Sequence, residues 1–198
     1  MTNMFPLQIH PLSPNLFPTY KIMCGYIFDP IQNPCLDIVF QISGEHPTFN
    51  KKDGKEQTHH GNWGLWEFNV FEVFLKPNFT QSNRNKQNSK YQPYFEYELG
   101  FNQEYLCLNF HSYREGGSSP LDCPIISSSK NSLASNIFQY KMSIKLPQFE
   151  MKVDSWSGNF YSILGQGGDR TYWGQNLERN KLDFHLASQF LPLHLNNK

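Results

Sequence analysis

Apolar and polar residues alternate along much of this chain, in short runs that turn residues separate. The clearest run covers residues 138–146, where Phe, Tyr, Met, Ile and Leu take every second position and Gln, Lys and Ser fill the rest. Residues 36–43 repeat the pattern with Ile38, Phe40 and Ile42. A period of two is that of a β-strand with one buried face, so both segments are predicted to be strands.

Similar runs elsewhere raise the expected number of strands to about nine. The further expected strands cover residues 20–28, 68–75, 94–99, 105–113, 159–164, 170–174 and 190–195. Two short turns, "GFNQE" and "GQGGD", would join four of them into hairpins. Because no long stretch has helical periodicity, the chain is predicted to be all-β. The expected architecture is an antiparallel β-sandwich, jelly-roll or immunoglobulin-like, with long polar loops.

The order of the segments favours one domain. Residues 1–19 hold four prolines and are expected to form an extended N-terminal arm. Residues 20–198 are expected to form a single sandwich domain, because no internal repeat divides them. The polar segments 44–63, 76–92 and 114–134 are expected to be surface loops.

The charge balance argues against two classes of partner. Lysine and arginine number 17, aspartate and glutamate also 17, so the net charge is zero. A neutral chain has no overall field to attract nucleic acid or an anionic membrane, and neither partner is expected. No stretch is long enough to span a bilayer, and the first residues lack a basic secretory leader. A cytoplasmic location is therefore favoured, and the oligomeric state stays open.

The four cysteines predict neither a zinc site nor a redox motif, because no two of them have the spacing of a CxxC pair. These cysteines are Cys24, Cys35, Cys107 and Cys123. An even number permits disulfides, but buried thiols are the preferred interpretation.

Candidate chemistry begins with Trp66 and Glu72, which lie before and inside the strand expected at 68–75. An aromatic ring can cover the apolar C–H face of a sugar, and a carboxylate accepts hydrogen bonds from its hydroxyls. In a fully extended chain the two residues would lie about 20 Å apart, so Trp66 must curl back to share a ligand with Glu72. The alternatives are a core position for Trp66 and a structural bond for Glu72, for example to Arg170.

Two more glutamates, Glu96 and Glu98, alternate with apolar residues in the strand expected at 94–99. This pattern is typical of an exposed sheet face, which is the preferred interpretation. In the alternative, they join Glu72 in an acidic cleft that suits hydroxyl groups, a calcium ion or a pair of glycosidase carboxylates.

The last candidates are Arg170, Phe184 and His185. Arg170 follows a glycine-rich turn and could present its planar guanidinium to a ligand or pair with Glu72. Phe184 and His185 precede the last expected strand. His185 could contact a ligand, or it could close a turn with Asp183.

Four segments in order resemble the DOMON-like superfamily, and within it the family 9 carbohydrate-binding modules. They read "LWEFNVFEVFLKP", "YFEYELGFNQEYLCLNF", "NFYSILGQGGDRTYW" and "DFHLASQFLPLHL", and the resemblance covers the chain from about Leu36 onward. It implies a β-sandwich that binds a sugar or, in other branches, haem. The aromatic positions of the sugar site match Trp66 and Phe184, where a tryptophan is usual at the second, and the strand glutamate matches Glu72.

The predicted function is therefore non-catalytic binding of a carbohydrate or a similar small polar ligand. The expected site residues are Trp66, Glu72, Glu96, Arg170, Phe184 and His185. An enzyme that uses Glu72 with Glu96 or Glu98 on glycosides is one alternative. The other is a haem-binding DOMON module, with His185 and one of Met23, Met142 and Met151 as axial ligands. No cofactor is indicated by the residues themselves, although calcium or haem is compatible with them.

Overall fold

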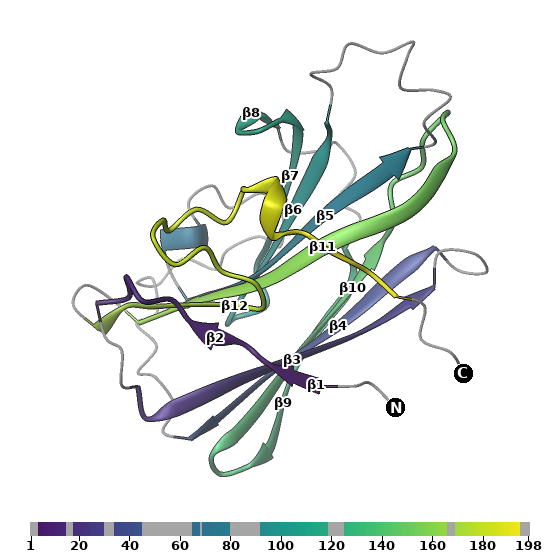
Figure 1. Cartoon of the computed structure of the whole chain (residues 1–198). Coiled ribbons are helices and arrows are strands. Elements are labelled where there is room, and N and C mark those ends of the chain that lie inside the picture. Colours follow the sequence, from purple (N-terminus) through teal and green to yellow (C-terminus); the bar gives the residue numbers. More distant parts are fainter. Residues whose placement is uncertain are drawn as a thin grey trace.

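The computed structural model describes residues 4–14, 18–29, 34–44, 65–67, 69–79, 92–118, 125–165 and 169–194. These residues form two antiparallel sheets that pack face to face (Figure 1). The β-sandwich predicted from the alternating pattern is thus confirmed.

The smaller sheet has five strands. Their order is β1 (Met4–Pro6), β3 (Tyr20–Asp29), β4 (Cys35–Gly44), β10 (Ile137–Lys145) and β9 (Ile125–Ala134). The apolar residues of β4 and β10 face inward in the predicted register, because Phe40 pairs with Tyr140 and Ile38 with Met142.

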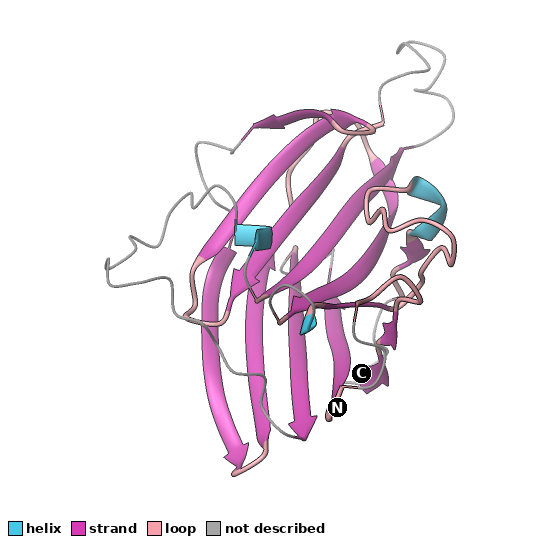
Figure 2. Ribbon diagram, turned by 90° about the vertical axis from the view of Figure 1, so that its left-hand side faces the viewer, coloured by secondary structure: helices cyan, strands magenta, loops and turns pink. Residues whose placement is uncertain are grey.

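The larger sheet has eight strands. Its order is β2 (Gln8–Ile9), β12 (Thr171–Gly174), β11 (Val153–Leu164), β5 (Val70–Phe79), β6 (Tyr94–Gly100), β7 (Tyr105–Ser112) and β8 (Glu115–Ser118), and β13 (Leu191–Pro192) also pairs with β11. Two 3-10 turns accompany this sheet, η1 (Leu65–Glu67) and η3 (Ala187–Gln189). Figure 2 shows both sheets from the side, with the η3 segment lying against the larger one.

The structure corrects two expected loops. Strand β5 continues to Phe79, so residues 76–79 are not part of a loop. Strands β8 and β9 form inside the segment 114–134, although "IISSSKNSLA" of β9 shows no regular apolar period. An edge strand of this kind is held by its backbone pairing with β10 rather than by burial of its side chains. The remainder of the expected loops, in 45–64, 80–91 and 119–124, lies outside the described residues.

The N-terminal segment joins both sheets. Strand β1 pairs with β3 in the smaller sheet, and β2 pairs with β12 in the larger one. Leu7 lies between them and is buried in the core. The ring nitrogen Nε2 of His10 also lies 2.8 Å from the carbonyl oxygen of Glu178, close to the other end of the chain.

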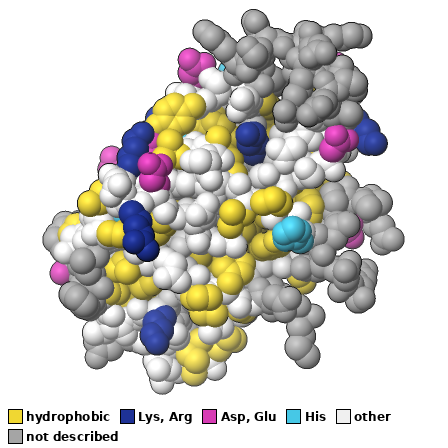
Figure 3. Space-filling model, in the orientation of Figure 1, with side chains coloured by type: hydrophobic (Ala, Val, Ile, Leu, Met, Phe, Trp, Pro, Cys, Tyr) yellow, Lys and Arg dark blue, Asp and Glu magenta, His cyan; other side chains and the backbone are white. Residues whose placement is uncertain are grey.

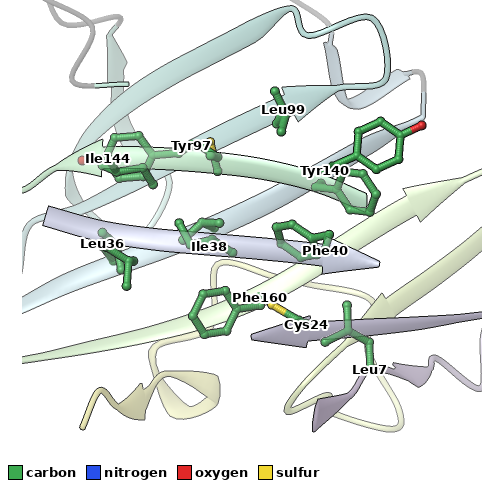
Figure 4. Close-up of a cluster of buried hydrophobic side chains, with 14 of the residues drawn as sticks. Leu7, Cys24, Leu36, Ile38, Phe40, Tyr97, Leu99, Tyr140, Ile144 and Phe160 are labelled. Atoms are coloured by element: carbon green, nitrogen blue, oxygen red, sulfur yellow. The ribbon is translucent and has the colours of Figure 1, made fainter. Parts of the chain in front are cut away.

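The main core lies between the two sheets and is rich in aromatic rings (Figure 4). Phe40 of the smaller sheet stacks on Phe71 of the larger one, with 4.5 Å between ring centroids. Tyr140 packs against Phe71 and Phe101 at 4.9 and 4.7 Å. Such offset aromatic pairs add to the stabilisation that burial of their area provides.

A second apolar cluster covers the outer face of the larger sheet. Its members come from η1, from β5, β6, β7 and β11, and from the segment after β12: Leu65, Val70, Phe74, Tyr94, Leu106, Leu108, Phe110, Tyr161, Ile163 and Phe184. Residues 175–190 form the lid of this cluster, and we call them the C-terminal cover. The larger sheet is therefore buried on both faces, which explains the unbroken run of buried residues from Val70 to Leu75.

A glycine makes room for the cover. A Cβ atom at Gly174 would lie 2.6 Å from both Tyr161 and Leu177, so no other residue fits without movement. Gly174 pairs with Tyr161 across β12 and β11. The close approach lets the chain turn back from β12 over the ring of Tyr161.

The cysteine prediction was wrong at one position. Cys107 is disulfide-bonded, whereas Cys24 and Cys35 are not. Burial raises the pKa of the Cys24 thiol well above its ordinary value, which makes this thiol unreactive. Among the described residues, no helix has the length and apolar character needed to cross a bilayer.

We predict that Asn159→Ala loosens the C-terminal cover. The side-chain amide nitrogen of buried Asn159 lies 2.9 and 2.8 Å from the carbonyl oxygens of Asn176 and Gln189, both in the cover. The carbonyl of Gln189 keeps the side-chain amide of Asn176 as a donor, but that of Asn176 loses its bond to Asn159. The free energy of unfolding should fall by about 2 kcal/mol. Chemical denaturation measures this change. Asn78→Ala, which removes bonds to Ser155 and Ser157 nearer the surface, should cost less than about 1 kcal/mol, and equal losses would contradict the assignment.

Candidate functional site

Three glutamates gather on the outer face of the larger sheet. Glu72 of β5 lies directly opposite Glu98 of β6, and Glu96 lies two positions before Glu98 in β6, on the same face. Their exposed fractions are 2% for Glu72, 5% for Glu96 and 0% for Glu98. The preferred interpretation of Glu96 and Glu98 as an exposed face was therefore wrong, because the C-terminal cover buries this side of the sheet.

The three carboxyl groups lie close enough to share protons or a cation. One oxygen from each lies within 4.8 Å of the others. Among the described residues, no N–H or hydroxyl group donates to Glu98, and its carboxyl meets only that of Glu96, with which it can share a proton. Burial and mutual repulsion both raise the free energy of the ionised carboxyl groups. The protonated form of the cluster is therefore the more stable one.

The pKa values follow from this burial. Loss of solvation, and then repulsion from the neighbouring glutamates, raises the pKa of Glu72 and of Glu98 well above the ordinary value. Burial likewise raises the pKa of Glu96 to about 7, with the hydrogen bond to Glu98 and then the charge of Arg114 acting in the opposite direction. Near neutral pH the cluster therefore holds protons that a solvent-exposed glutamate has lost.

An ion network anchors the cover beside the cluster. Asp183 is bound by Arg114 at 3.1 Å and by Lys181 at 2.8 Å, and it also accepts a hydrogen bond from the hydroxyl of Tyr113. These bonds outweigh the burial of Asp183 and lower the pKa of its carboxyl. The backbone N–H of His185 donates to the same carboxylate, as expected for a turn that Asp183 and His185 close together.

His185 points from the cover toward the glutamates. The hydroxyl of Tyr94 accepts the backbone N–H of Arg114 and lies within hydrogen-bond distance of Nδ1 of His185, at 2.8 Å. In the tautomer in which this hydroxyl donates to Nδ1, the imidazole proton is on Nε2, which lies 3.9 Å from Oε2 of Glu96. Burial lowers the pKa of His185 to about 4, and the ring is therefore neutral at pH 7.

Phe184 faces the sheet rather than solvent. Its ring stacks on Tyr161 with 4.1 Å between centroids and an angle of 12° between planes. The ring of Tyr172 meets Phe184 edge-on at 6.4 Å. One face of Phe184 is thus already covered, and 9% of the residue stays exposed.

A cavity of about 460 Å³ lies between the cover and the sheet. Its lining combines carboxyl groups, aromatic rings and aliphatic side chains: Glu72, Phe74, Glu96, Leu108, Phe110, Arg114, Gly117, Ile163, Tyr172, Leu182, Phe184 and His185. This size and mixture are typical of a small-molecule site. On the face shown in Figure 3, charged side chains of both signs are scattered among apolar ones without a basic patch.

The structure brings four of the six predicted site residues to this cavity: Glu72, Glu96, Phe184 and His185. Arg170 lies behind the lining, with its guanidinium 5.7 Å from the ring centroid of Tyr172, and its charge favours the ionised form of Glu72. The backbone of Trp66 belongs to η1, and its side chain lies outside the described part of the structure.

Sequence reasoning missed Arg114, Tyr172 and Phe110. Phe110 shares its face of β7 with Leu106 and Leu108, so alternation in that strand could have indicated it. Arg114 lies in a turn with a positive φ of 56°, and no pattern in the sequence connects it with Asp183. Only the fold brings these distant segments together.

A second cavity, of about 690 Å³, lies elsewhere in the molecule and is lined by none of the predicted site residues. Phe149, Met151 and Trp156 are among the residues that line it. Met142 is buried in the main core, on the opposite side of the larger sheet from His185. The structure therefore does not pair His185 with Met142 or Met151 as haem ligands.

The cluster could hold a hard cation. Calcium prefers six to eight oxygen ligands, and three carboxylates offer at most six. Here the carboxyls would first have to give up their protons.

No protein-family model matches the sequence, and no curated protein matches it. Two solved structures share the fold, both of family 9 carbohydrate-binding modules from Caldicellulosiruptor kristjanssonii. The module in complex with glucose is 11% identical, with a TM-score of 0.56 over 97% of this chain and 85% of that one. The module in complex with cellotriose is 12% identical, with a TM-score of 0.50 over 86% of this chain and 72% of that one. At such low identity, the likeness shows a common fold.

The glutamate cluster predicts an unusual dependence of stability on pH. Because burial and mutual repulsion raise the pKa of Glu98 above its value in the unfolded chain, the folded form binds more protons and loses stability as the pH rises above about 4.5. Glu98→Gln removes this loss. Its free energy of unfolding relative to the natural protein should rise by about 1–3 kcal/mol between about pH 5 and pH 7.5.

Denaturant titrations at several pH values measure this difference. His185 and Asp183 also titrate at acid pH, but they do so in both proteins and cancel. The Glu150→Gln variant is the control, because Glu150 lies exposed on the surface and is not a member of the cluster. A flat difference for Glu98→Gln would show that the three carboxyls are not buried together.

Proposed function

We propose that this chain binds a small carbohydrate without transforming it, in the cavity beneath the C-terminal cover. The observation that carries the proposal is the composition of this cavity, where buried carboxyl groups and aromatic rings line one space of about 460 Å³. A sugar ring needs both kinds of contact, because it has apolar C–H faces and a rim of hydroxyl groups. The common fold with modules solved in complex with glucose and cellotriose supports the same ligand class.

The protonation state suits hydroxyl recognition. A neutral carboxyl group can donate one hydrogen bond and accept others, whereas a carboxylate only accepts. The raised pKa values of Glu72 and Glu96 therefore let these groups contact hydroxyls in either direction. Neutral His185 would add an Nε2–H donor beside Glu96.

Each predicted residue takes a role in this proposal. Phe184 offers an apolar edge and part of a ring face to the sugar, and Trp66 is proposed as the second aromatic contact. Glu72, Glu96 and His185 would bind hydroxyl groups. Arg170 would act from behind the lining, by attracting the carboxyl group of Glu72.

Glycoside hydrolysis is a second candidate, because the carboxyl oxygens approach within 4.8 Å and retaining glycosidases hold their two carboxyl groups about 5 Å apart. Such an enzyme needs one ionised carboxylate as nucleophile, and burial opposes this in all three glutamates. If hydrolysis is the function, chromogenic glycosides are turned over and Glu72→Gln abolishes the turnover. A lack of product across a broad panel would favour binding alone.

We predict that glucose and cello-oligosaccharides bind at the first cavity and not at the second. Titration followed by 15N NMR should shift the amides of Phe184, His185 and Gly117, while those of Phe149 and Trp156 stay in place. Shifts confined to the second cavity would contradict the proposed site. Absence of any shift with a panel of mono- and oligosaccharides would contradict the function.

The variant Tyr172→Ala tests the same proposed site by mutation. Tyr172 is half-buried and lines the cavity, so its loss should weaken binding about tenfold or more through the lost ring contact. Tyr26→Ala is the control, because Tyr26 is also half-buried but packs on Phe160, away from the cavity. Calorimetry should find sugar affinity unchanged in that control.

A further inference from the structure

We propose that the preferred ligand carries a positively charged amino group, so that the sugar is an amino sugar rather than a neutral one. This inference rests on the proposed function and names the class of sugar that the same cavity selects. It starts from the three buried glutamates rather than from the aromatic lining.

The first argument is an unsatisfied carboxyl group. Glu98 is fully buried, and the neighbouring carboxyl of Glu96 is the one hydrogen-bonding group that reaches it among the described residues, so no N–H or hydroxyl donor compensates for its lost water. One oxygen from each of the three carboxyl groups, those of Glu72, Glu96 and Glu98, lies within 4.8 Å of the others. Glu72 and Glu96 line the cavity, so a donor group in the cavity reaches this cluster directly. Leaving such groups without a donor is costly, which makes a ligand with several N–H donors favourable.

The second argument is the charge around the cluster. Two of the three nearby cations, Arg114 and Lys181, are bound to Asp183. The third, Arg170, attracts Glu72 and lies over the ring of Tyr172. Once the three glutamates have lost their protons, the described surroundings hold four carboxylates, which are Glu72, Glu96, Glu98 and Asp183, against three cations, so the ionised form of the cluster is the one that a ligand cation would match.

No other group facing the cluster supplies the missing charge. The ring of His185 faces Glu96 from the cover, but its low pKa of about 4 keeps it neutral. The hydroxyls of Tyr94 and Tyr161 stay protonated, because burial raises their pKa values. One positive charge from a ligand would balance the set.

The third argument is the lining, which favours an organic cation over a bare metal ion. Phe74, Phe110 and Phe184 face the cavity together with aliphatic side chains, and they would not ligate a metal. An ammonium group has three N–H donors, which can be matched to the carboxyl groups of the cluster. The carbon ring that carries it would fill the aromatic part of the space, where ring faces also attract positive charge.

Binding of such a ligand would be coupled to proton release. An ammonium group pairs with carboxylates and not with neutral carboxyls, so its binding must draw a proton from the cluster. The pKa of Glu96 is about 7, and the amine should therefore bind more tightly as the pH rises from about 6 to about 7.5. A neutral sugar has no charge to pair and should show a weaker dependence.

Calorimetry on the full chain tests this with three matched sugars: glucosamine, N-acetylglucosamine and glucose. Glucosamine should bind about tenfold tighter than either other sugar at about pH 7, and its advantage should shrink at about pH 5.5. N-acetylglucosamine has a nitrogen at the same position but no positive charge. Comparing it with glucosamine therefore shows whether the charge of the amine, and not the nitrogen substituent itself, strengthens binding. Proton release should appear as a heat of binding that changes with the ionisation enthalpy of the buffer.

Glu98→Gln should reduce the ratio of glucosamine to glucose affinity to near one, whereas the exposed Glu150→Gln should leave that ratio unchanged. Thermal unfolding confirms that each variant is folded.

Equal affinities for the three sugars in the natural protein would overturn this inference and leave sugar binding in place. Failure of all three sugars to bind would overturn the proposed function itself. Tight calcium binding that depends on Glu98, with no preference for the amine, would replace the amino sugar by a metal ion.

Discussion

Removal of carboxyl groups from water is the constraint on which this structure depends. The larger sheet is covered on both faces, and its outer face contains three glutamates that solvent would reach in an ordinary sandwich but that the C-terminal cover buries here. Their burial costs free energy unless protons, a ligand or an ion compensate for the lost water. A chain selected for stability alone would gain by replacing them with residues such as leucine. Under the proposed function, a ligand would complete the polar contacts that this cluster leaves open.

The C-terminal cover turns this sheet face into a cavity. It is fixed by an ion network around Asp183 on one side and by the amide of Asn159 on the other. Between these two anchors the cover stands away from the glutamates and leaves space for a small molecule. The same cover buries the glutamates and positions His185, so the electrostatics and the shape of the site have one structural origin.

Local patterns in the sequence predicted most strands but not what covers them. The alternation in β4 and β10 identified their inward residues, since each of these strands has one buried face. The same reasoning failed for Glu96 and Glu98, because the residues that bury them are about ninety positions away in the chain. Glu72 was recognised because a carboxyl within an apolar strand is unusual in itself. Arg114 and Tyr172 carry no such local signal, and β9 was missed because its backbone pairing does not depend on apolar side chains.

The N-terminal segment has a consequence for how the protein folds. Strand β2 can find its place only when β12 exists, and the His10 ring meets the backbone of Glu178, which is 168 residues later. During synthesis β2 must therefore wait, unpaired, until β12 has left the ribosome, whereas β1 can pair much earlier with β3. Contacts between residues that are far apart in the sequence form slowly. We therefore expect the larger sheet to be completed in a late, cooperative step after synthesis. The cavity over the glutamates depends on the same constraint, because its cover, residues 175–190, follows β12 in the chain and forms after it.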